Sequence, residues 1–263
     1  MLIKVLSKKF KYIYGPVYSW RLGRSLGIDL LSCNKKVCNF DCIYCQLGSN
    51  SGYVSQPKIY VKTSEIIREL NKLPSLNLDY ITFSGSGEST LAGNLSGAIK
   101  AVKKLNIAPV CVLTNAALIN NKNIQKALSY ADLVVAKLDA YSQASLEKIN
   151  KPAKAVTFKT IIKGIKSFKK GFRGKLALQL MFVKENKQQA GEIAELAREI
   201  NPDEIQINTP RRASRVKPLS SKEISRIKKY FSGMNFISVY DSKSKQIKPL
   251  NKKETLKRRK AAV

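Results

Sequence analysis

Residues 37–48 read Val-Cys-Asn-Phe-Asp-Cys-Ile-Tyr-Cys-Gln-Leu-Gly and place three cysteines, Cys38, Cys42 and Cys45, in a C-x-x-x-C-x-x-C pattern. Thiolates this close together in the chain can face one metal centre. A structural zinc site uses four protein ligands, and an iron–sulfur cluster normally takes four cysteines. Three cysteines therefore predict a metal centre that keeps one coordination position for another molecule.

A zinc site completed by a fourth ligand elsewhere in the chain is the alternative that the pattern leaves open. Cys33 is near enough in sequence to be that ligand. Zinc sites more often combine two C-x₂₋₄-C half-sites, however. We therefore expect Cys33 and Cys111 to be ordinary buried thiols.

Composition limits the class of protein. The chain has 263 residues, of which 44% are hydrophobic, and this is enough for a sizeable core. It contains no histidine, which excludes Ser-His-Asp and Cys-His catalysis and every histidine-ligated zinc site. The sequence has no signal-peptide pattern and no apolar run of about 18 residues, so we expect no membrane partner. Five cysteines, three of them clustered, argue against a disulfide framework and favour a cytoplasmic location.

The net charge is extreme. Lysine and arginine number 48 against 18 aspartates and glutamates, which gives a formal net charge of +30. Such a chain attracts polyanions, and nucleic acid is the obvious candidate. A lysine-rich composition without functional meaning is the alternative, because no aromatic RNA-binding motif accompanies the charge.

Short apolar runs alternate with amphipathic stretches from residue 26 onward. We predict strands at 26–32, 80–84, 109–113, 133–138, 176–183 and 204–208, with a last strand at 236–240. We predict helices at 63–73, 97–105, 121–128, 142–149, 155–169, 188–200 and 220–231. Strands joined by helical crossovers pair in parallel, so the pattern predicts an α/β fold, either a doubly wound sheet or a partial or complete (β/α) barrel.

The same pattern predicts three parts of the chain. Residues 1–219 are expected to form the barrel with an N-terminal extension. Residues 220–242 are expected to add a C-terminal helix and a last strand packed on the barrel. Residues 243–263 are rich in lysine, serine and asparagine and predict a flexible basic tail.

Polar and glycine-rich stretches follow the predicted strands. Functional groups gather at the carboxyl ends of parallel strands, so we expect these stretches to share one edge of the sheet. Lys137 interrupts the apolar run 133–138, and a surface position at the strand end is the favoured interpretation. The strand ends are the cysteine loop, 84–88, 114–115, Asp139, 181–184 and 208–211.

The cysteine motif, with an aromatic residue before its last cysteine and a strand before the loop, resembles that of the radical S-adenosylmethionine (SAM) superfamily. The resemblance implies a parallel partial (β/α)₆ barrel in which Cys38, Cys42 and Cys45 bind a [4Fe–4S] cluster and SAM chelates the fourth iron. It implies an enzyme that cleaves SAM reductively to a 5′-deoxyadenosyl radical for hydrogen abstraction. The cofactors carry that chemistry, and the protein orients them and excludes water.

The resemblance also implies which residues bind SAM. The stretch 84–88 sits where the family carries a Gly-Gly-Glu motif, and its backbone with Glu88 would receive the ammonium group of SAM. Tyr44 corresponds to the aromatic residue whose backbone meets the adenine. Later strands add contacts to SAM or substrate, with a capping or solvent-facing role as the alternative. The expected SAM-binding residues are Tyr44, Gly85, Ser86, Gly87, Glu88, Asn115, Asp139 and Gln179.

Four further stretches narrow the resemblance. Residues 15–29, 138–140, 149–152 and 205–210 look like those of short Fe–S oxidoreductases grouped with the wyosine-type tRNA-modifying enzymes, over residues 14–219. The true wyosine synthases hold a second cluster on further cysteines, and Cys33 and Cys111 are too few for one. The imidazoline-forming reaction of the wyosine synthases is therefore not expected. The cysteine motif favours a radical SAM enzyme, and the net charge of +30 favours tRNA or another nucleic acid as its substrate.

Other functions stay open. They are radical SAM chemistry on a peptide or small anionic metabolite, and a non-catalytic zinc-stapled nucleic-acid-binding module. The pairs Arg21 with Arg24 and Arg211 with Arg212 are candidates to hold an anionic substrate. The expected partners are a reductant protein such as a ferredoxin or flavodoxin, and tRNA or another nucleic acid.

Overall fold

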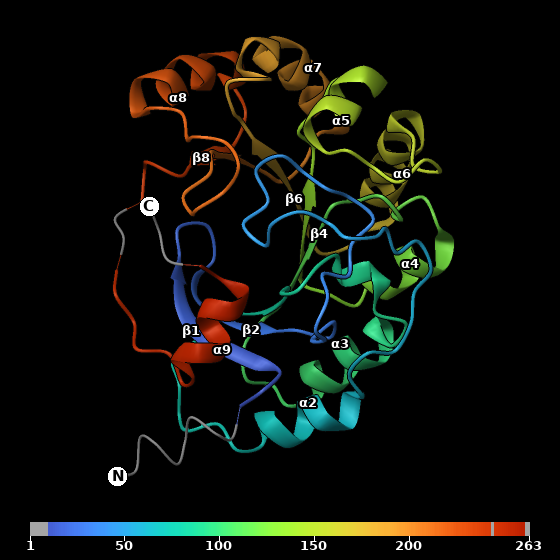
Figure 1. The fold of residues 1–263 in the computed structure, drawn as a ribbon, viewed down its shortest axis with the longest axis vertical. Helices are drawn as coiled ribbons and strands as arrows, with labels where there is room; N and C mark the ends of the chain where they lie inside the picture. Colours follow the sequence, from blue (N-terminus) through green and yellow to red (C-terminus); the bar gives the residue numbers. More distant parts are fainter. Residues whose placement is uncertain (1–9, 243–244, 261–263) are drawn as a thin grey trace.

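A computed structural model describes residues 10–242 and 245–260. Within them the strands form one eight-stranded sheet, in which neighbouring strands follow one another in chain order. The first two strands pair antiparallel, and every later neighbouring pair is parallel. The sheet curves into a half-barrel (Figure 1). Its strands are β1 (Ile13–Ser19), β2 (Gly23–Ile28), β3 (Tyr80–Phe83), β4 (Val110–Thr114), β5 (Leu133–Lys137), β6 (Lys175–Met181), β7 (Glu204–Asn208) and β8 (Phe236–Ser238).

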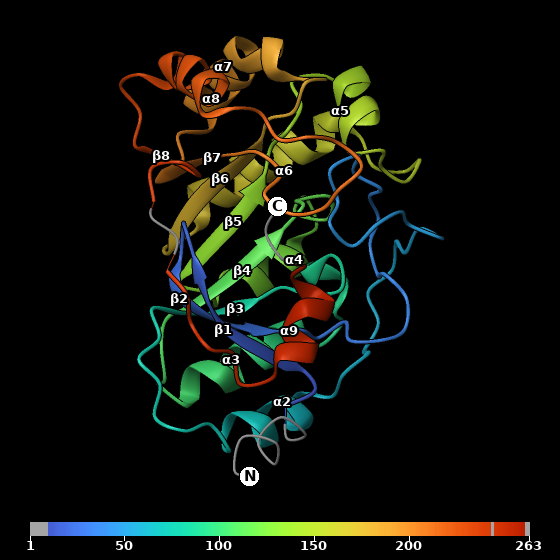
Figure 2. The same cartoon turned by 60° about the vertical axis from the view of Figure 1, so that its left-hand side comes forward.

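The helices between residues 63 and 228 connect the parallel strands and lie around the outside of the curved sheet (Figures 1 and 2). They turn apolar side chains to the sheet, as in α7, where Ile193, Ala197 and Ile200 recur at helical spacing and are buried. The helices are α2 (Thr63–Leu70), α3 (Leu95–Lys104), α4 (Lys122–Leu128), α5 (Gln143–Ile149), α6 (Phe158–Gly171), α7 (Ala190–Ile200), α8 (Ser221–Lys228) and α9 (Lys252–Arg258).

The two faces of the sheet are packed differently. Along β4, Val110 and Val112 belong to the large core beneath the helices, whereas Cys111 points to the opposite face. There Cys111 packs with Leu22, Leu133, Val135 and Ala177 in a small second cluster, and the neighbouring Leu22 and Leu113 also line a cavity. The concave face is therefore closed by apolar side chains at one level and hollow beside it.

The parallel strands and their helices confirm the predicted fold, whereas the N-terminal hairpin was not predicted. The strand predicted at 26–32 is β2, which ends at Ile28 because the Asp29 carboxylate accepts the backbone N–H of Leu31 and turns the chain. β1 pairs with it at the sheet edge, with an irregular register between Tyr14 and Val17. The intervening Pro16 has no N–H for a ladder, and sheet edges tolerate this.

The C-terminal segment also differs from its prediction. Instead of a flexible tail through 243–263, residues 252–258 form α9, which packs against β1 (Figure 2). Its last residue, Arg258, is fully buried, and its Nε lies 2.6 Å from Oδ2 of Asp29. The buried carboxylate of Asp29 therefore pairs with one arginine of the basic C-terminal segment, Arg258, and this pair holds α9 against β1. The remaining tail residues, 243–244 and 261–263, lie outside the described residues.

In the part of the chain that the structure describes, no helix is both long and apolar enough to span a bilayer.

The buried Asp29–Arg258 pair gives a stability prediction. Asp29→Asn keeps the side-chain shape but leaves the Arg258 charge without its main partner, and this should lower the free energy of unfolding by about 3 kcal/mol. Urea denaturation measures the change. Glu195→Ala, which breaks the exposed Arg198–Glu195 pair, is the control and should cost less than about 1 kcal/mol. Equal losses in the two variants would show that α9 is not held by this pair.

Candidate functional site

The cysteine loop is fixed between two backbone segments. On one side, Val37 N–H donates to the carbonyl oxygen of Ser86 at 3.0 Å, and Glu88 N–H donates to that of Val37 at 2.8 Å. On the other side, Asp41 N–H donates to the carbonyl of Asn150 at 3.1 Å, beyond the end of α5. The three cysteines therefore lie in a loop held between the ends of β3 and α5.

The docking of the cysteine loop explains why residue 87 is a glycine. A Cβ atom on Gly87 would strike the carbonyl oxygen of Val37, to which this residue is bridged. Only glycine permits this close approach of two backbones. The glycine-rich stretch that resembles a SAM-binding motif thus also holds the cysteine loop in place.

Nitrogen donors point at two of the sulfur atoms. Phe40 N–H lies 3.4 Å from Sγ of Cys38, and Asn115 Nδ2 lies 3.8 Å from the same atom. Asn150 Nδ2 lies 3.4 Å from Sγ of Cys42. Such hydrogen bonds stabilise negative charge on a sulfur ligand.

Burial opposes that charge while no metal is bound. It raises the pKa of the Cys38 thiol far above its usual range, with the charges of Cys42 and Glu88 adding to the effect. Burial also raises the pKa of Cys42 to about 11, against the opposing effect of the hydrogen bond from Asn150. The Cys38 and Cys42 thiols are therefore protonated at neutral pH until a cation displaces the protons.

The donor set fits an iron–sulfur cluster. Among residues 10–242 and 245–260, no three Cys, His, Asp or Glu side chains converge as ligands of a single metal ion. A cubane cluster does not require such convergence, because each cysteine binds a different iron. Three thiols, two of which receive N–H donors at their sulfur atoms, are ligands of the kind that this cluster uses.

Arg215, in the segment after β7, hydrogen-bonds to the middle of the cysteine loop. Its NH2 donates to the carbonyl of Cys42 at 2.8 Å and to Oδ1 of Asp41 at 3.1 Å. Burial alone would raise the pKa of Asp41, but hydrogen bonds from Arg215 and from Asn50 N–H lower it below the usual value. Arg215 thus holds the peptide next to a cysteine and is a positioning residue.

A buried polar network lies beside Cys42. The Tyr44 hydroxyl donates to Oδ2 of Asp139, and Asn150 Nδ2 donates to both groups at 2.9 Å. Lys137 Nζ lies 3.3 Å from Oδ1 of Asp139 and 3.3 Å from Oε1 of Gln179. Lys137 is therefore inside the half-barrel, and the surface position favoured from the sequence is wrong. The carboxylate two residues further along the chain explains why the cation is tolerated there.

The Glu88 carboxylate accepts hydrogen bonds from neighbouring groups of the protein. Its Oε1 accepts from Thr114 Oγ1 at 2.6 Å and from the amide and hydroxyl of Thr90, and its Oε2 accepts from Asn115 N–H at 2.6 Å. Burial raises its pKa, which these hydrogen bonds partly oppose. Ser86 is engaged as well, since its hydroxyl donates to Asp29. The backbone of this stretch, more than its carboxylate, is the part available to an ammonium group.

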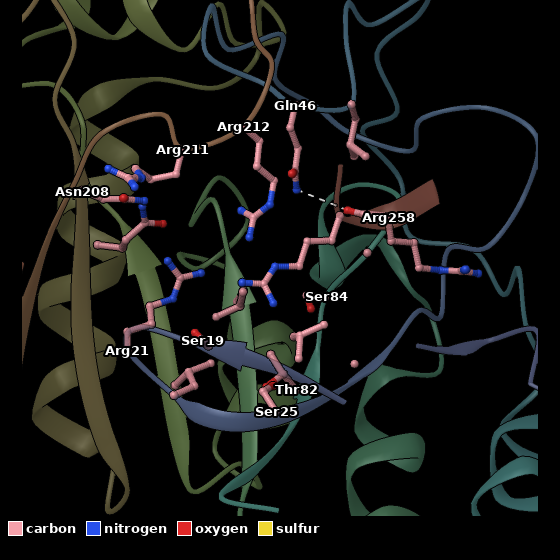
Figure 3. Close-up of a pocket in the computed structure, with 18 of the residues that line it drawn as sticks. Ser19, Arg21, Ser25, Gln46, Thr82, Ser84, Asn208, Arg211, Arg212 and Arg258 are labelled. Carbon is pink, nitrogen blue, oxygen red and sulfur yellow. Dashed lines mark hydrogen bonds between the residues drawn. The ribbon is translucent and has the colours of Figure 1, made fainter. Parts of the chain in front are cut away.

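A cavity of about 340 Å³ lies over the concave face of the sheet, beside the cysteine loop (Figure 3). Of the predicted site residues, Cys45, Tyr44, Gly85, Gly87 and Gln179 line it. Asn115 and Asp139 line a second cavity of about 10 Å³ instead. Cys38, Cys42, Ser86 and Glu88 are not among the residues described as lining either cavity.

The predicted arginine pairs are divided by the fold. Arg21, Arg211 and Arg212 line the cavity. Arg24 instead pairs with Asp79 at 3.5 Å, and both side chains are exposed. Cys111 is fully buried as expected, whereas Cys33 is partly exposed and donates to the carbonyl of Lys35.

Four residues of the site were not singled out from the sequence: Asn150, Arg215, Arg258 and Arg259. Asn150 lies in the stretch 149–152 that carries part of the family resemblance, so a signal existed. The three arginines are indistinguishable from the general basic excess until the fold gives each its neighbours.

Comparison with known proteins agrees with the geometry. The sequence model of the radical SAM superfamily matches residues 36–197. A UPF0026 protein of Synechocystis sp. is 40% identical over 215 residues, which cover 81% of this chain and 80% of that protein. A UPF0026 protein of Methanocaldococcus jannaschii is 31% identical over 231 residues, covering 85% and 71%. A Brachyspira hyodysenteriae protein named GTPase Obg is 37% identical over 231 residues, covering 85% of this chain but only 34% of that protein.

Solved structures show the same fold. Streptococcus suis SuiB bound to S-adenosylmethionine superposes with a TM-score of 0.61 at 17% identity, covering 78% of this chain and 48% of SuiB. A radical SAM methyltransferase from Sphaerobacter thermophilus has a TM-score of 0.61 at 12% identity, covering 81% and 65%. At these identities the likeness concerns the fold, and it confirms the partial barrel.

The hydrogen bond from Asn150 to Cys42 gives a prediction for the protein with its iron–sulfur cluster bound. Asn150→Leu removes the N–H donor to Cys42, and loss of a hydrogen bond to a sulfur ligand should lower the reduction potential of the cluster by roughly tens of millivolts. A redox titration followed by electron paramagnetic resonance measures this. Asn123→Leu, on the exposed side of α4, is the matched control and should keep the wild-type potential. An unchanged potential in Asn150→Leu would contradict the assignment of Cys42 as a ligand.

Proposed function

This chain belongs to the radical SAM superfamily, and we propose that it acts on a nucleotide of RNA, with tRNA as the first candidate. It is an Fe–S enzyme. When bound, the [4Fe–4S] cluster and SAM of this superfamily supply the reductive cleavage that gives a 5′-deoxyadenosyl radical for hydrogen abstraction. This membership contradicts the alternative of a non-catalytic zinc-stapled module.

The residues of the loop have separate tasks in this proposal. Cys38, Cys42 and Cys45 would hold the cluster, while Asn115 and Asn150 would donate hydrogen bonds to its sulfur ligands. The main chain at Gly85 and Gly87 and the side chain of Gln179 would bind SAM, since they line the cavity beside Cys45. Tyr44 stays protonated, because burial and then the charge of Asp139 raise its pKa well above 10, and it fixes the loop as a hydrogen-bond donor.

One observation carries the choice of substrate: the cavity that adjoins the cysteine loop is also lined by arginines, in a chain of net charge +30. A radical made in this cavity must react with a group that enters it. Arginine recognises phosphate through planar pairs of donors, and a basic surface draws in a polyanion. An RNA nucleotide supplies both the local phosphate and the extended negative charge.

A small anionic metabolite is the second candidate. The arginines that favour RNA would also bind a free phosphorylated compound, and a cavity of about 340 Å³ is large enough for a small molecule. Either substrate needs an electron donor. We propose a small reductant protein such as a ferredoxin or flavodoxin.

Product formation tests the substrate. Anaerobically reconstituted protein with dithionite and SAM should form 5′-deoxyadenosine faster when unmodified tRNA is added, and deuterium from labelled tRNA should enter that product. Cys42→Ser should form none, because one ligand of the cluster is lost. Stimulation by phosphorylated metabolites but not by tRNA would overturn the RNA substrate and favour the second candidate.

Salt dependence tests the electrostatic part of the proposal. If phosphate contacts drive RNA binding, the affinity should fall by roughly 10²-fold or more between 50 and 200 mM salt. The reason is that the release of counterions from the RNA contributes less free energy to binding when the salt concentration is high. A filter-binding titration with tRNA measures this. An affinity that does not change with salt would contradict a role for the basic surface.

A further inference from the structure

The cavity wall has an excess of positive charge. Its described lining residues include five arginines and one lysine, and no aspartate or glutamate. Two of these cations pair with carboxylates, Arg258 with Asp29 and Lys137 with Asp139. Arg211 is exposed and lies over the ring of Tyr240 at 5.0 Å. The other three are the partly buried Arg21, Arg212 and Arg259, of which Arg21 lies over the ring of Trp20 at 5.7 Å.

These three arginines come from distant parts of the chain. Arg21 lies in the turn between β1 and β2, Arg212 follows β7, and Arg259 follows α9. Figure 3 shows the guanidinium groups of Arg21 and Arg212 pointing toward one another across the cavity. The fold therefore brings like charges together, which needs an explanation.

None of the three guanidinium groups has a described carboxylate within 4.0 Å. Arg259 donates one hydrogen bond, to the carbonyl of Tyr18 at 3.1 Å. The Nε of Arg21 is buried and has no hydrogen-bond partner in the described residues. A buried donor without an acceptor is costly, so this group is set up for an acceptor that enters the cavity.

The electrostatics agree with the geometry. Burial, with the charges of Arg259 and Arg21 acting in the same direction, lowers the pKa of Arg212 to about 9. Burial likewise lowers the pKa of Arg21 to about 10, and the charge of Arg259 adds to that shift. Both pKa values are therefore lowered first by burial and then by a neighbouring arginine.

We propose that Arg21, Arg212 and Arg259 form a binding subsite for a phosphoryl group of the substrate, separate from the place of SAM. A phosphoryl group offers more acceptor oxygens and more negative charge than a single carboxylate, so it fits three guanidinium groups better. The subsite would hold the substrate at the wall of the cavity that also contains Cys45. The inference deepens the proposed function and rests on this cavity being the place of reaction.

Phosphate binding tests the subsite without turnover. Inorganic phosphate is titrated by calorimetry into the reconstituted protein with SAM present, against a sodium chloride background of constant ionic strength. Wild type should bind it, and Arg21→Gln, Arg212→Gln and Arg259→Gln should each weaken binding about tenfold, since each removes a charge-assisted hydrogen bond. Arg226→Gln is the matched control, because it removes one exposed positive charge from α8 and should bind as wild type does.

Three results would overturn the proposal. The first is absence of phosphate binding by wild type, and the second is an equal loss of binding in Arg226→Gln. The third is a loss of SAM affinity in the three variants as large as the loss of phosphate affinity, which would assign the arginines to SAM. Thermal melting of each variant checks the fold. Arg212→Gln remains decisive if the others fail to fold, because the described structure gives its side chain no hydrogen bond to lose.

Competition separates this subsite from the choice of substrate. Displacement of bound phosphate by tRNA would support both the subsite and the RNA substrate. Displacement by ribose 5-phosphate but not by tRNA would support the subsite while contradicting the RNA substrate. Displacement by neither would contradict the subsite as a place for substrate.

Discussion

One buried carboxylate holds three parts of the molecule together. Asp29 ends β2, where its Oδ1 accepts the N–H of Leu31 and starts the segment that leads to the cysteine loop. Its Oδ2 accepts from Ser86, in the stretch against which that loop docks, and from Arg258 at the end of α9. The loop, the glycine-rich stretch and the C-terminal helix are therefore positioned by one side chain that is 1% exposed.

This arrangement explains why the cavity has two chemically different sides. The cysteine loop and the main chain at Gly85 and Gly87 form one side, and they carry the Cys45 thiol and peptide groups. The hairpin turn, the segment after β7 and α9 supply the arginines of the other. Because α9 is fixed through Arg258, the backbone of the adjacent Arg259 is already held beside the cavity, and this reduces the entropy lost when its side chain binds there. The basic C-terminal segment thus belongs to the site.

The parallel strands and most helices could be predicted because their signals are local. Apolar runs and helical spacing decide them, and β7 was predicted with the bounds that it has. The positions that failed depend on distant partners. Lys137 enters the half-barrel because Asp139 and Gln179 receive it, and Arg258 is buried because Asp29, 229 residues away in sequence, pairs with it. No local pattern distinguishes these cations from the other lysines and arginines of the chain.

The central claim is that three cysteines hold a cluster whose remaining iron is open to SAM. Electron paramagnetic resonance of the reconstituted, dithionite-reduced protein tests it most directly, with spectra recorded before and after SAM is added. We expect a [4Fe–4S]⁺ signal whose g values change with SAM and which is absent in Cys42→Ser. A signal that SAM leaves unchanged would mean that no coordination position is open, and that these cysteines do not form a SAM-binding cluster site.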